Sequence, residues 1–338
     1  MAAHPQTPDQ QDQITRRAFL QRLGYAAAVT AAVAGIGLLR HDEHGPAIQA
    51  RPTALSGLGN FALPEFTGAA GRLALVEGLD RVQTVTRGVE ALGGMETFIQ
   101  RGDRVLIKVN AAFATPPTLG ATTHPELLTA VARLCFQAGA AQVLVTDNPI
   151  NDPQTCFRVT GLETAARQTG ARLILPQPAL FQPVTLPAGR LLQQWPTLAG
   201  VFAGIHKVII LSPVKDHQRA GASMTLKNLY GFLGGRRNIF HQDINGIITE
   251  LAQLLKPTLC ILDGTVSMVT NGPTGGSLSD LKETGLMIVS TDPVAADAVG
   301  VELLGRRLAD IPYIQMAAAA GAGLADPQQL QGVILPAK

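Results

Sequence analysis

Short apolar runs alternate with longer amphipathic segments along most of the chain. The runs 104–110 and 142–148 are rich in Val, Leu and Ile, and this pattern predicts two buried strands. Between them, apolar positions from Leu127 to Ala138 recur at helical spacing, and Gly139 follows as a helix C-cap. A strand, a helix and a second strand in this order indicate a βαβ unit, with parallel strands and a right-handed crossover.

The same alternation resumes after a Pro-rich stretch at 176–200. Further strands are predicted at 207–212, 257–264 and 286–290, with helical periodicity from Ile244 to Leu255 and over 292–305 and 310–320. We therefore predict an α/β domain over residues 71–338, with one or more mainly parallel sheets and flanking helices. The Pro-rich stretch is the expected boundary between two lobes, with a cleft between them.

The first fifty residues follow a different pattern. The segment "ITRRAFLQRLGYAAAVTAAVAGIGLLR" places paired arginines before Phe-Leu and an uncharged run over 23–39. That run is shorter than the ~20 apolar residues of a membrane-spanning helix, and its layout resembles a twin-arginine (Tat) signal. We predict a signal peptide and linker at 1–50, a lead-in at 51–70, and export by the Tat machinery to the periplasm or another extracytoplasmic site. An uncleaved leader would anchor the protein; otherwise no stable membrane span is expected.

Composition and charge argue against nucleic acid as a partner. The charges are scattered along the chain, the net charge is +2 and aromatic residues make up 4%. A nucleic-acid interface needs a one-sided basic field or aromatic platforms for single strands, so no nucleic acid is expected as a partner. Cys135, Cys156 and Cys260 are widely spaced without a C-x-x-C pair, so no intrinsic iron–sulfur cluster is expected.

Polar side chains follow four of the predicted strands, at the point where each strand ends. In open parallel sheets, ligands bind outside the carboxyl ends of the strands, so these residues predict a shared crevice. Asp residues also form turns and helix caps, and that interpretation stays open for Asp147 and Asp263. The residues at the four strand ends are Lys108 and Asn110, Asp147, Lys215 with His217, and Asp263.

The stretch "KDHQRAGASMTLKNLYG" and the residues after it carry the densest polar cluster. Its cations suit a carboxylate or phosphate, and its glycines allow close approach of the backbone. His217 and His241 could transfer protons or bind a metal. The cations are Lys215, Lys227, Arg236 and Arg237, and the glycines are Gly231, Gly234 and Gly235.

Two kinds of ligand fit these residues, a small anion or a divalent metal. The anion hypothesis gives Lys215, His217, Lys227 and His241 catalytic roles. It assigns ligand or cofactor binding to Lys108, Asn110, Asp147, Asn228, Gly272 and Gly275. The metal hypothesis takes His217, His241, Asp263 and Asp297 as ligands, the last because it lies in an otherwise apolar helix. The histidine spacing matches no recognised metal motif, so we favour the anion.

Several blocks of the sequence, in a fixed order, resemble one family. The blocks "VLIKVN", "TTHPELLTAVARLCFQAGAAQVLVTDN", "VIILSPVKDHQRAGASMTLKNLYG", "DGTVSMVTNGPTGG" and "STDPVAADAVGVELLG" are similar to the domain of unknown function 362 family, over most of 72–324. Some relatives carry a ferredoxin-like segment, whose cysteine set this chain lacks. A fainter likeness links the chain to the nickel-pincer lactate racemase group. The resemblance implies no reaction, only that recurring positions are matched by Lys108, Asn110, Lys215, His217, Lys227, Asn228, His241, Asp263 and Asp297.

Two functions are consistent with these observations. The first is an exported enzyme or cofactor-binding protein with a Lys/His/Asp cleft for an anionic ligand or a metal. The alternative is a non-catalytic periplasmic module that binds and carries a small carboxylate or a metal complex.

Overall fold

A nine-stranded sheet forms the centre of the fold in the computed structural model, which describes residues 17, 21, 25 and 58–337. The strand order is β13-β2-β12-β11-β8-β3-β4-β5, and β9 pairs with β8 outside this path. The strands are β2 (Arg72–Glu77), β3 (Arg104–Lys108), β4 (Gln142–Thr146), β5 (Arg172–Ile174), β8 (Lys207–His217), β9 (Gly221–Ser223), β11 (Leu259–Met268), β12 (Leu281–Ser290) and β13 (Gln331–Leu335).

The sheet is mainly parallel, which confirms the predicted fold class. The neighbours β11, β8, β3, β4 and β5 run parallel, and so do β13 and β2. The exceptions are β12, antiparallel to both β11 and β2, and the short β9, antiparallel to β8. The sequence predicted a short strand at 286–290, but β12 begins earlier and forms a long hairpin with β11.

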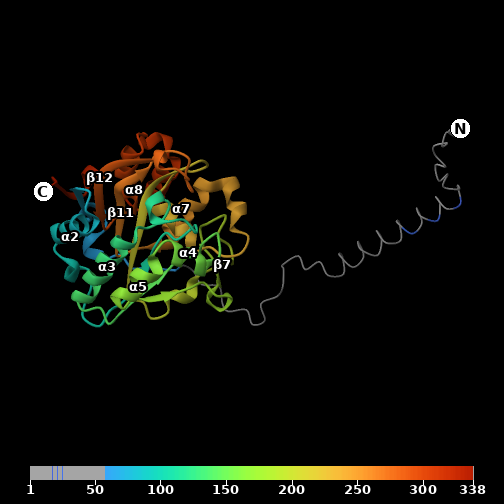
Figure 1. The fold of residues 1–338 in the computed structure, drawn as a ribbon, viewed down its shortest axis with the longest axis horizontal. Helices are drawn as coiled ribbons and strands as arrows, with labels where there is room; N and C mark the ends of the chain where they lie inside the picture. Colours follow the sequence, from blue (N-terminus) through green and yellow to red (C-terminus); the bar gives the residue numbers. More distant parts are fainter. Residues whose placement is uncertain (1–16, 18–20, 22–24, 26–57, 338) are drawn as a thin grey trace, which may run out of the picture. The chain divides into compact units, whose positions relative to one another are not determined.

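Helices cover both faces of the sheet (Figure 1). Successive residues of one strand pack into different cores: Ile209 of β8 belongs to the core with α2 to α5, and Ile210 to the core with α6 to α9. Burial on both faces explains why the central strands are continuous apolar runs. The helices are α2 (Arg81–Ala91), α3 (Pro125–Gln137), α4 (Pro153–Val159), α5 (Leu162–Thr169), α6 (Thr225–Asn228), α7 (Ile244–Leu254), α8 (Pro293–Leu303) and α9 (Pro312–Ala319).

The Pro-rich stretch 176–200 forms a small antiparallel sheet of β6 (Gln182–Val184) and β7 (Trp195–Thr197). This sheet is bonded to the segment after α6, because Leu198 N–H donates to the Phe232 carbonyl and Gly234 N–H donates to the Pro196 carbonyl, both at 2.8 Å. The described residues 58–337 belong to one compact unit, and the boundary between two lobes at 176–200 stays a prediction.

The predicted lead-in is described only in part. Its strand β1 (Gly59–Asn60) pairs in parallel with β10 (Leu255–Lys256) at the end of α7. The predicted leader at 1–50 lies outside the described residues, apart from three single positions, and stays a prediction. In the part of the chain that the structure describes, no helix has the length and apolar character needed to cross a bilayer.

Candidate functional site

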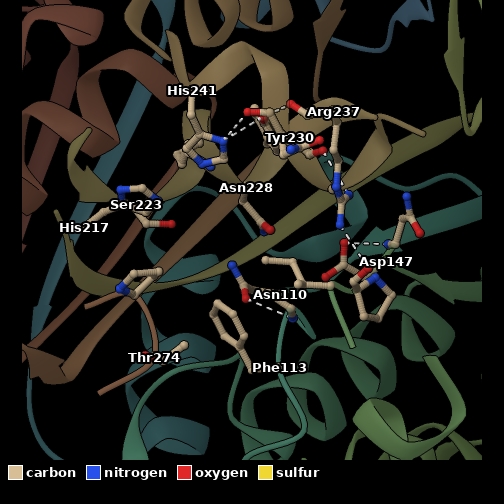
Figure 2. A pocket seen from close by; sticks show the side chains of 18 of the residues that line it. Asn110, Phe113, Asp147, His217, Ser223, Asn228, Tyr230, Arg237, His241 and Thr274 are labelled. Carbon is tan, nitrogen blue, oxygen red and sulfur yellow. Dashed lines mark hydrogen bonds between the residues drawn. The ribbon is translucent and has the colours of Figure 1, made fainter. Parts of the chain in front are cut away.

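A pocket of about 650 Å³ opens at the carboxyl ends of the adjacent strands β8, β3 and β4. Seven of the ten residues with a predicted catalytic or ligand-binding role line it: Asn110, Asp147, Lys215, His217, Lys227, Asn228 and His241. Figure 2 shows His217 and His241 on one side of the pocket and Arg237 and Asp147 on the other. The crevice predicted from the polar strand ends therefore exists, at three of the four strands.

Two of these residues, Lys215 and His217, lie within strand β8 and not in a loop after it. The strand was expected to end at 212, but it continues to His217 because β9 returns alongside it. Lys215 is paired with Ser223 and His217 with Gly221 in this antiparallel ladder. Both side chains thus project from paired strand backbone, and not from a turn.

Lys108 lies beside the pocket and is paired with Asp147. Its ammonium is 2.8 Å from Asp147 Oδ1 and donates to Asn228 Oδ1 at 2.9 Å. The other oxygen of Asp147 accepts a hydrogen bond from Ala111 N–H at 2.6 Å. Burial lowers the pKa of Lys108, and Asp147 opposes that effect. This buried pair joins the ends of β3 and β4, and the bond to Asn228 connects them to the end of α6.

A glycine makes this ion pair possible. A side-chain Cβ at Gly231 would lie 2.1 Å from Asp147 Oδ1 and 2.7 Å from the Lys108 ammonium. The sequence predicted that glycines in this region let the backbone approach a ligand closely. In the structure, the backbone of Gly231 lies against the Lys108–Asp147 pair. Its carbonyl also accepts a hydrogen bond from Asn148 N–H at 3.1 Å.

Lys215 and Lys227 are buried cations whose neighbours are aromatic rings. The Lys215 ammonium donates to the Ala121 carbonyl and lies 5.2 Å from the Phe113 ring centre, and Lys227 lies 3.9 Å from the Tyr230 ring centre. Burial lowers the pKa of each lysine to about 7. Nearby positive charge adds to this, chiefly Lys108 for the first and Lys215 for the second.

The pocket carries an excess of positive charge. Among the described residues that line it, Asp147 is the only carboxylate, and it is engaged by Lys108. Arg237 adds a third cation, held by the carbonyls of Leu233 at 3.1 Å and Pro149 at 2.9 Å. Lys215, Lys227 and Arg237 therefore surround a cavity whose one carboxylate among the described lining residues, Asp147, is shared with Lys108.

The rings of His217 and His241 are stacked, and the proton is on a different nitrogen in each. Their ring centres are 6.1 Å apart and their planes differ by 13°. His217 Nδ1 accepts from the N–H groups of Arg219 and Ala220, both at 3.2 Å, so its proton is on Nε2. His241 Nδ1 lies 3.1 Å from the Asn238 carbonyl, which places its proton on Nδ1 and leaves Nε2 as an acceptor.

Both imidazoles are neutral near pH 7. Burial, followed by the charges of Lys227 and Lys215, lowers the pKa of His217 to about 3. Burial also lowers the pKa of His241, against the opposing effect of the Asn238 carbonyl. His217 can therefore donate a hydrogen bond through Nε2, and His241 can accept a proton at Nε2.

The structure does not bring the four predicted metal ligands together. Asp263 lies within β11, where its carboxylate is 2.7 Å from Arg81 Nε of α2. Asp297 of α8 accepts from Thr225 N–H at 2.8 Å and Leu226 N–H at 3.0 Å, so it caps α6, and burial raises its pKa to about 7. Among the described residues 17, 21, 25 and 58–337, no group of three metal-binding side chains occurs. Two histidines beside three cations do not fit a divalent metal.

Gly272 and Gly275 shape a loop at the pocket without lining it. A Cβ at Gly272 would lie 2.0 Å from the Asp216 carbonyl oxygen, and Gly272 N–H donates to the carboxylate of Asp216 at 2.8 Å. Gly275 has a φ of +58°, which a side chain rarely adopts. The lining residues of this loop are Pro273 and Thr274, which lie between the two glycines.

Sequence reasoning missed the aromatic part of the pocket. Arg237 was recognised as a possible donor, whereas Phe113, Phe181 and Tyr230 were not considered. Their rarity was the available signal: with 4% aromatic residues in the chain, a tyrosine two positions after "TLKN" could have been noticed.

Comparison with known proteins identifies relatives of the region that forms the pocket. The family model described as a domain of unknown function (DUF362) matches residues 105–302. The thylakoid-associated protein sll1697 of Synechocystis sp. is 30% identical over 237 residues, which are 66% of this chain and 70% of that protein.

Two solved structures are distantly similar. One is a Thermotoga maritima protein from a structural genomics programme, with a TM-score of 0.35, 11% identity, and coverage of 70% of this chain and 59% of that one. The other is the lactate racemase apoprotein of Thermoanaerobacterium thermosaccharolyticum, with a TM-score of 0.39, 14% identity, and coverage of 71% and 58%. This chain spans less than two thirds of each, and the likeness concerns no individual residue of the pocket.

Proposed function

This chain belongs to the DUF362 family, and we propose that its pocket binds an organic anion, a carboxylate or a phosphate, and transfers protons on it. One observation carries the proposal: Lys215, Lys227 and Arg237 line the pocket, and its single carboxylate is already paired with Lys108. A bound anion would supply the missing negative charge.

The energetics of the empty pocket support this proposal. Burying unpaired positive charges destabilises a fold, and the low pKa of both lysines is the direct sign of that penalty. Such an arrangement is common at functional sites, where stability is given up for ligand recognition. Lysine–anion hydrogen bonds are charge-assisted and stronger than neutral ones, so binding would recover part of the penalty.

The histidine pair supports proton transfer in the same pocket. A neutral imidazole that presents a lone pair can act as a general base, and one that presents N–H can donate a hydrogen bond to the negative charge that develops on the ligand. His217 and His241 show these two forms, with ring centres 6.1 Å apart. The neighbouring lysines would stabilise negative charge that develops on the anion during proton removal.

A thermal-shift screen tests the proposal. Small carboxylates and phosphates should raise the melting temperature of the purified full-length chain, and neutral amides and alcohols of matching shape should not. Equal stabilisation by charged and neutral compounds would contradict it. Turnover of a stabilising anion would indicate an enzyme, and binding without turnover would favour the alternative of a carrier.

The location of this activity is a separate proposal. We propose that the twin-arginine segment exports the folded protein, on the basis of the sequence pattern alone. Substituting both Arg16→Lys and Arg17→Lys should then retain the full-length protein in the cytoplasm, as measured by cell fractionation. Unchanged export of the double variant would contradict this proposal.

A further inference from the structure

The pocket has an apolar part that the proposed anion site does not use. The residues concerned come from four separate segments, the loops after β3 and β4, the start of the β6–β7 sheet, and the 271–276 loop. They are Phe113, Pro149, Ile150, Phe181 and Pro273. A short acid held by two lysines would touch few of these groups.

The aromatic rings connect this apolar part to the cations. Phe113 lies beside Lys215, with 5.2 Å between ring centre and ammonium, so the anion site and the apolar lining meet at one side chain. Phe181 is packed tightly, because a Cβ at Gly234 would lie 2.5 Å from its ring. Phe113 and Phe181 are therefore held by their surroundings as parts of the lining.

Ile150 extends the apolar lining to the rim of the pocket. Its side chain is 66% exposed although it lines the pocket, and its N–H is held by the Ala112 carbonyl at 2.9 Å. A single exposed aliphatic residue needs no explanation. This one is bonded to the residue before Phe113, which lies beside Lys215, so the lining has apolar groups both at the buried cation and at the rim.

The size of the pocket also indicates a larger ligand. Pockets of roughly 300–1,000 Å³ are typical of drug-sized ligands, and this one is about 650 Å³. A short-chain acid would leave most of that space, and its apolar lining, in contact with water.

From these observations we propose that the ligand is an amphipathic anion, with its carboxylate or phosphate head at Lys215 and Lys227 and an apolar chain or ring along Phe113, Phe181 and Ile150. This inference rests on the proposed anion site and adds the class of ligand. Each methylene that enters the apolar part should improve affinity roughly fourfold.

Calorimetric titration with straight-chain carboxylates from propionate to decanoate, below their micelle concentrations, tests the inference. Affinity should rise with chain length in the wild-type protein, and the rise should be shallower in Ile150→Asn. Because Ile150 is 66% exposed, this substitution leaves the core intact. Ile334→Asn is the matched control, because Ile334 is 68% exposed on the edge strand β13 and does not line the pocket. A parallel series of alkyl phosphates decides which head group is preferred.

The outcomes separate the two proposals. Equal affinity for short and long acids, or a chain-length dependence that Ile150→Asn leaves unchanged, would overturn the amphipathic ligand and leave the anion site standing. If no carboxylate or phosphate of any length binds, the proposed function fails as well. Affinity that rises with length in the wild type and in Ile334→Asn, but less in Ile150→Asn, supports both.

Discussion

The ammonium of Lys227 lies 3.9 Å from the centre of the Tyr230 ring, and in the described part of the chain it has no carboxylate partner. A cation over an aromatic face gains about 0.5–2 kcal/mol, which is less than a buried charge loses on leaving water. Because the ring compensates only in part, the pKa of Lys227 falls to about 7. Lys227 is therefore a titratable group inside the pocket that still lacks an anionic partner among the described residues.

Anion affinity should decrease as the pH rises from about 6 to 8. In the empty pocket Lys215 and Lys227 have a pKa of about 7, and a bound anion raises both values by favouring the charged form. Binding therefore takes up protons, and above pH 7 affinity should fall by up to about tenfold per pH unit for each lysine that must be protonated. Calorimetry in two buffers of different ionisation enthalpy would measure this proton uptake. An affinity that stays flat over this range would contradict the charge state assigned to the lysines.

Replacing Lys227 by Met should stabilise the empty protein at neutral pH. The pKa of Lys227 is about 7 in the folded chain and near 10.5 when unfolded, so the unfolded state binds more protons between these values. The destabilisation is fully present below pH 7 and disappears as the pH rises toward 10.5. Lys227→Met should thus raise the free energy of unfolding by about 1–4 kcal/mol at pH 7. The gain should shrink at pH 10 in denaturant titrations, and a constant gain would argue against the assigned pKa.

Replacing Asp297, which does not line the pocket, should lower both stability and anion affinity. Asp297 accepts the N–H groups of Thr225 and Leu226 and so holds α6, which carries Lys227 and Asn228. Asp297→Ala leaves both buried donors unsatisfied, at about 1–3 kcal/mol each, and should also weaken anion binding while the protein is still folded. Asp297→Asn keeps one acceptor and should lie between the two.

Asp326, which caps an exposed helix, provides the control for Asp297→Ala. Asp326 accepts Gln328 N–H at 3.0 Å at an exposed helix start, so Asp326→Ala removes a similar bond far from α6. Denaturant unfolding and anion titration of both variants separate the effects. An Asp297→Ala protein that is less stable but binds anions normally would show that the residue has no positioning role.

Gly231→Ala should break the ion pair that orders the pocket wall. The new Cβ would lie 2.1 Å from Asp147 Oδ1, and neither Asp147 nor Lys108 can move without losing a buried partner. We expect a loss of stability of about 1–3 kcal/mol from overpacking, measured by denaturant unfolding. Gly332→Ala is the matched control, because the atoms nearest to its Cβ are 3.9 Å away. Equal effects of the two substitutions would refute this account of Gly231.

The sequence was sufficient for the fold class and for most of the polar pocket lining. Strands β3 and β4 end where their apolar runs give way to polar residues, so Asn110 and Asp147 could be placed at one edge of the sheet. In β8 the same signal was useful although the strand was longer than predicted, because Lys215 still faces the pocket.

The same signal did not locate a pocket residue at Asp263, and neither did the separate signal of an Asp in an apolar helix at Asp297. An Asp after an apolar run looks alike whether the strand ends or continues, and β11 continues past Asp263 because β12 pairs with it. The partners of these carboxylates are distant in sequence: Arg81 is 182 positions from Asp263, and Thr225 is 72 from Asp297. Local patterns carry no information on such contacts, and the predicted metal set depended on them.

The central claim, that the pocket binds an anion through its buried lysines, is tested most directly by titrating propionate and inorganic phosphate into wild type, Lys227→Met and Lys282→Met. Lys282 is exposed on β12 and does not line the pocket, so its substitution changes the net charge equally. A lost charge-assisted hydrogen bond of about 1.5–3 kcal/mol predicts that Lys227→Met weakens binding of at least one of the two anions roughly 10- to 100-fold. Lys282→Met should bind as the wild type does. Equal affinities in all three proteins, or no binding of either anion to the wild type, would contradict the account.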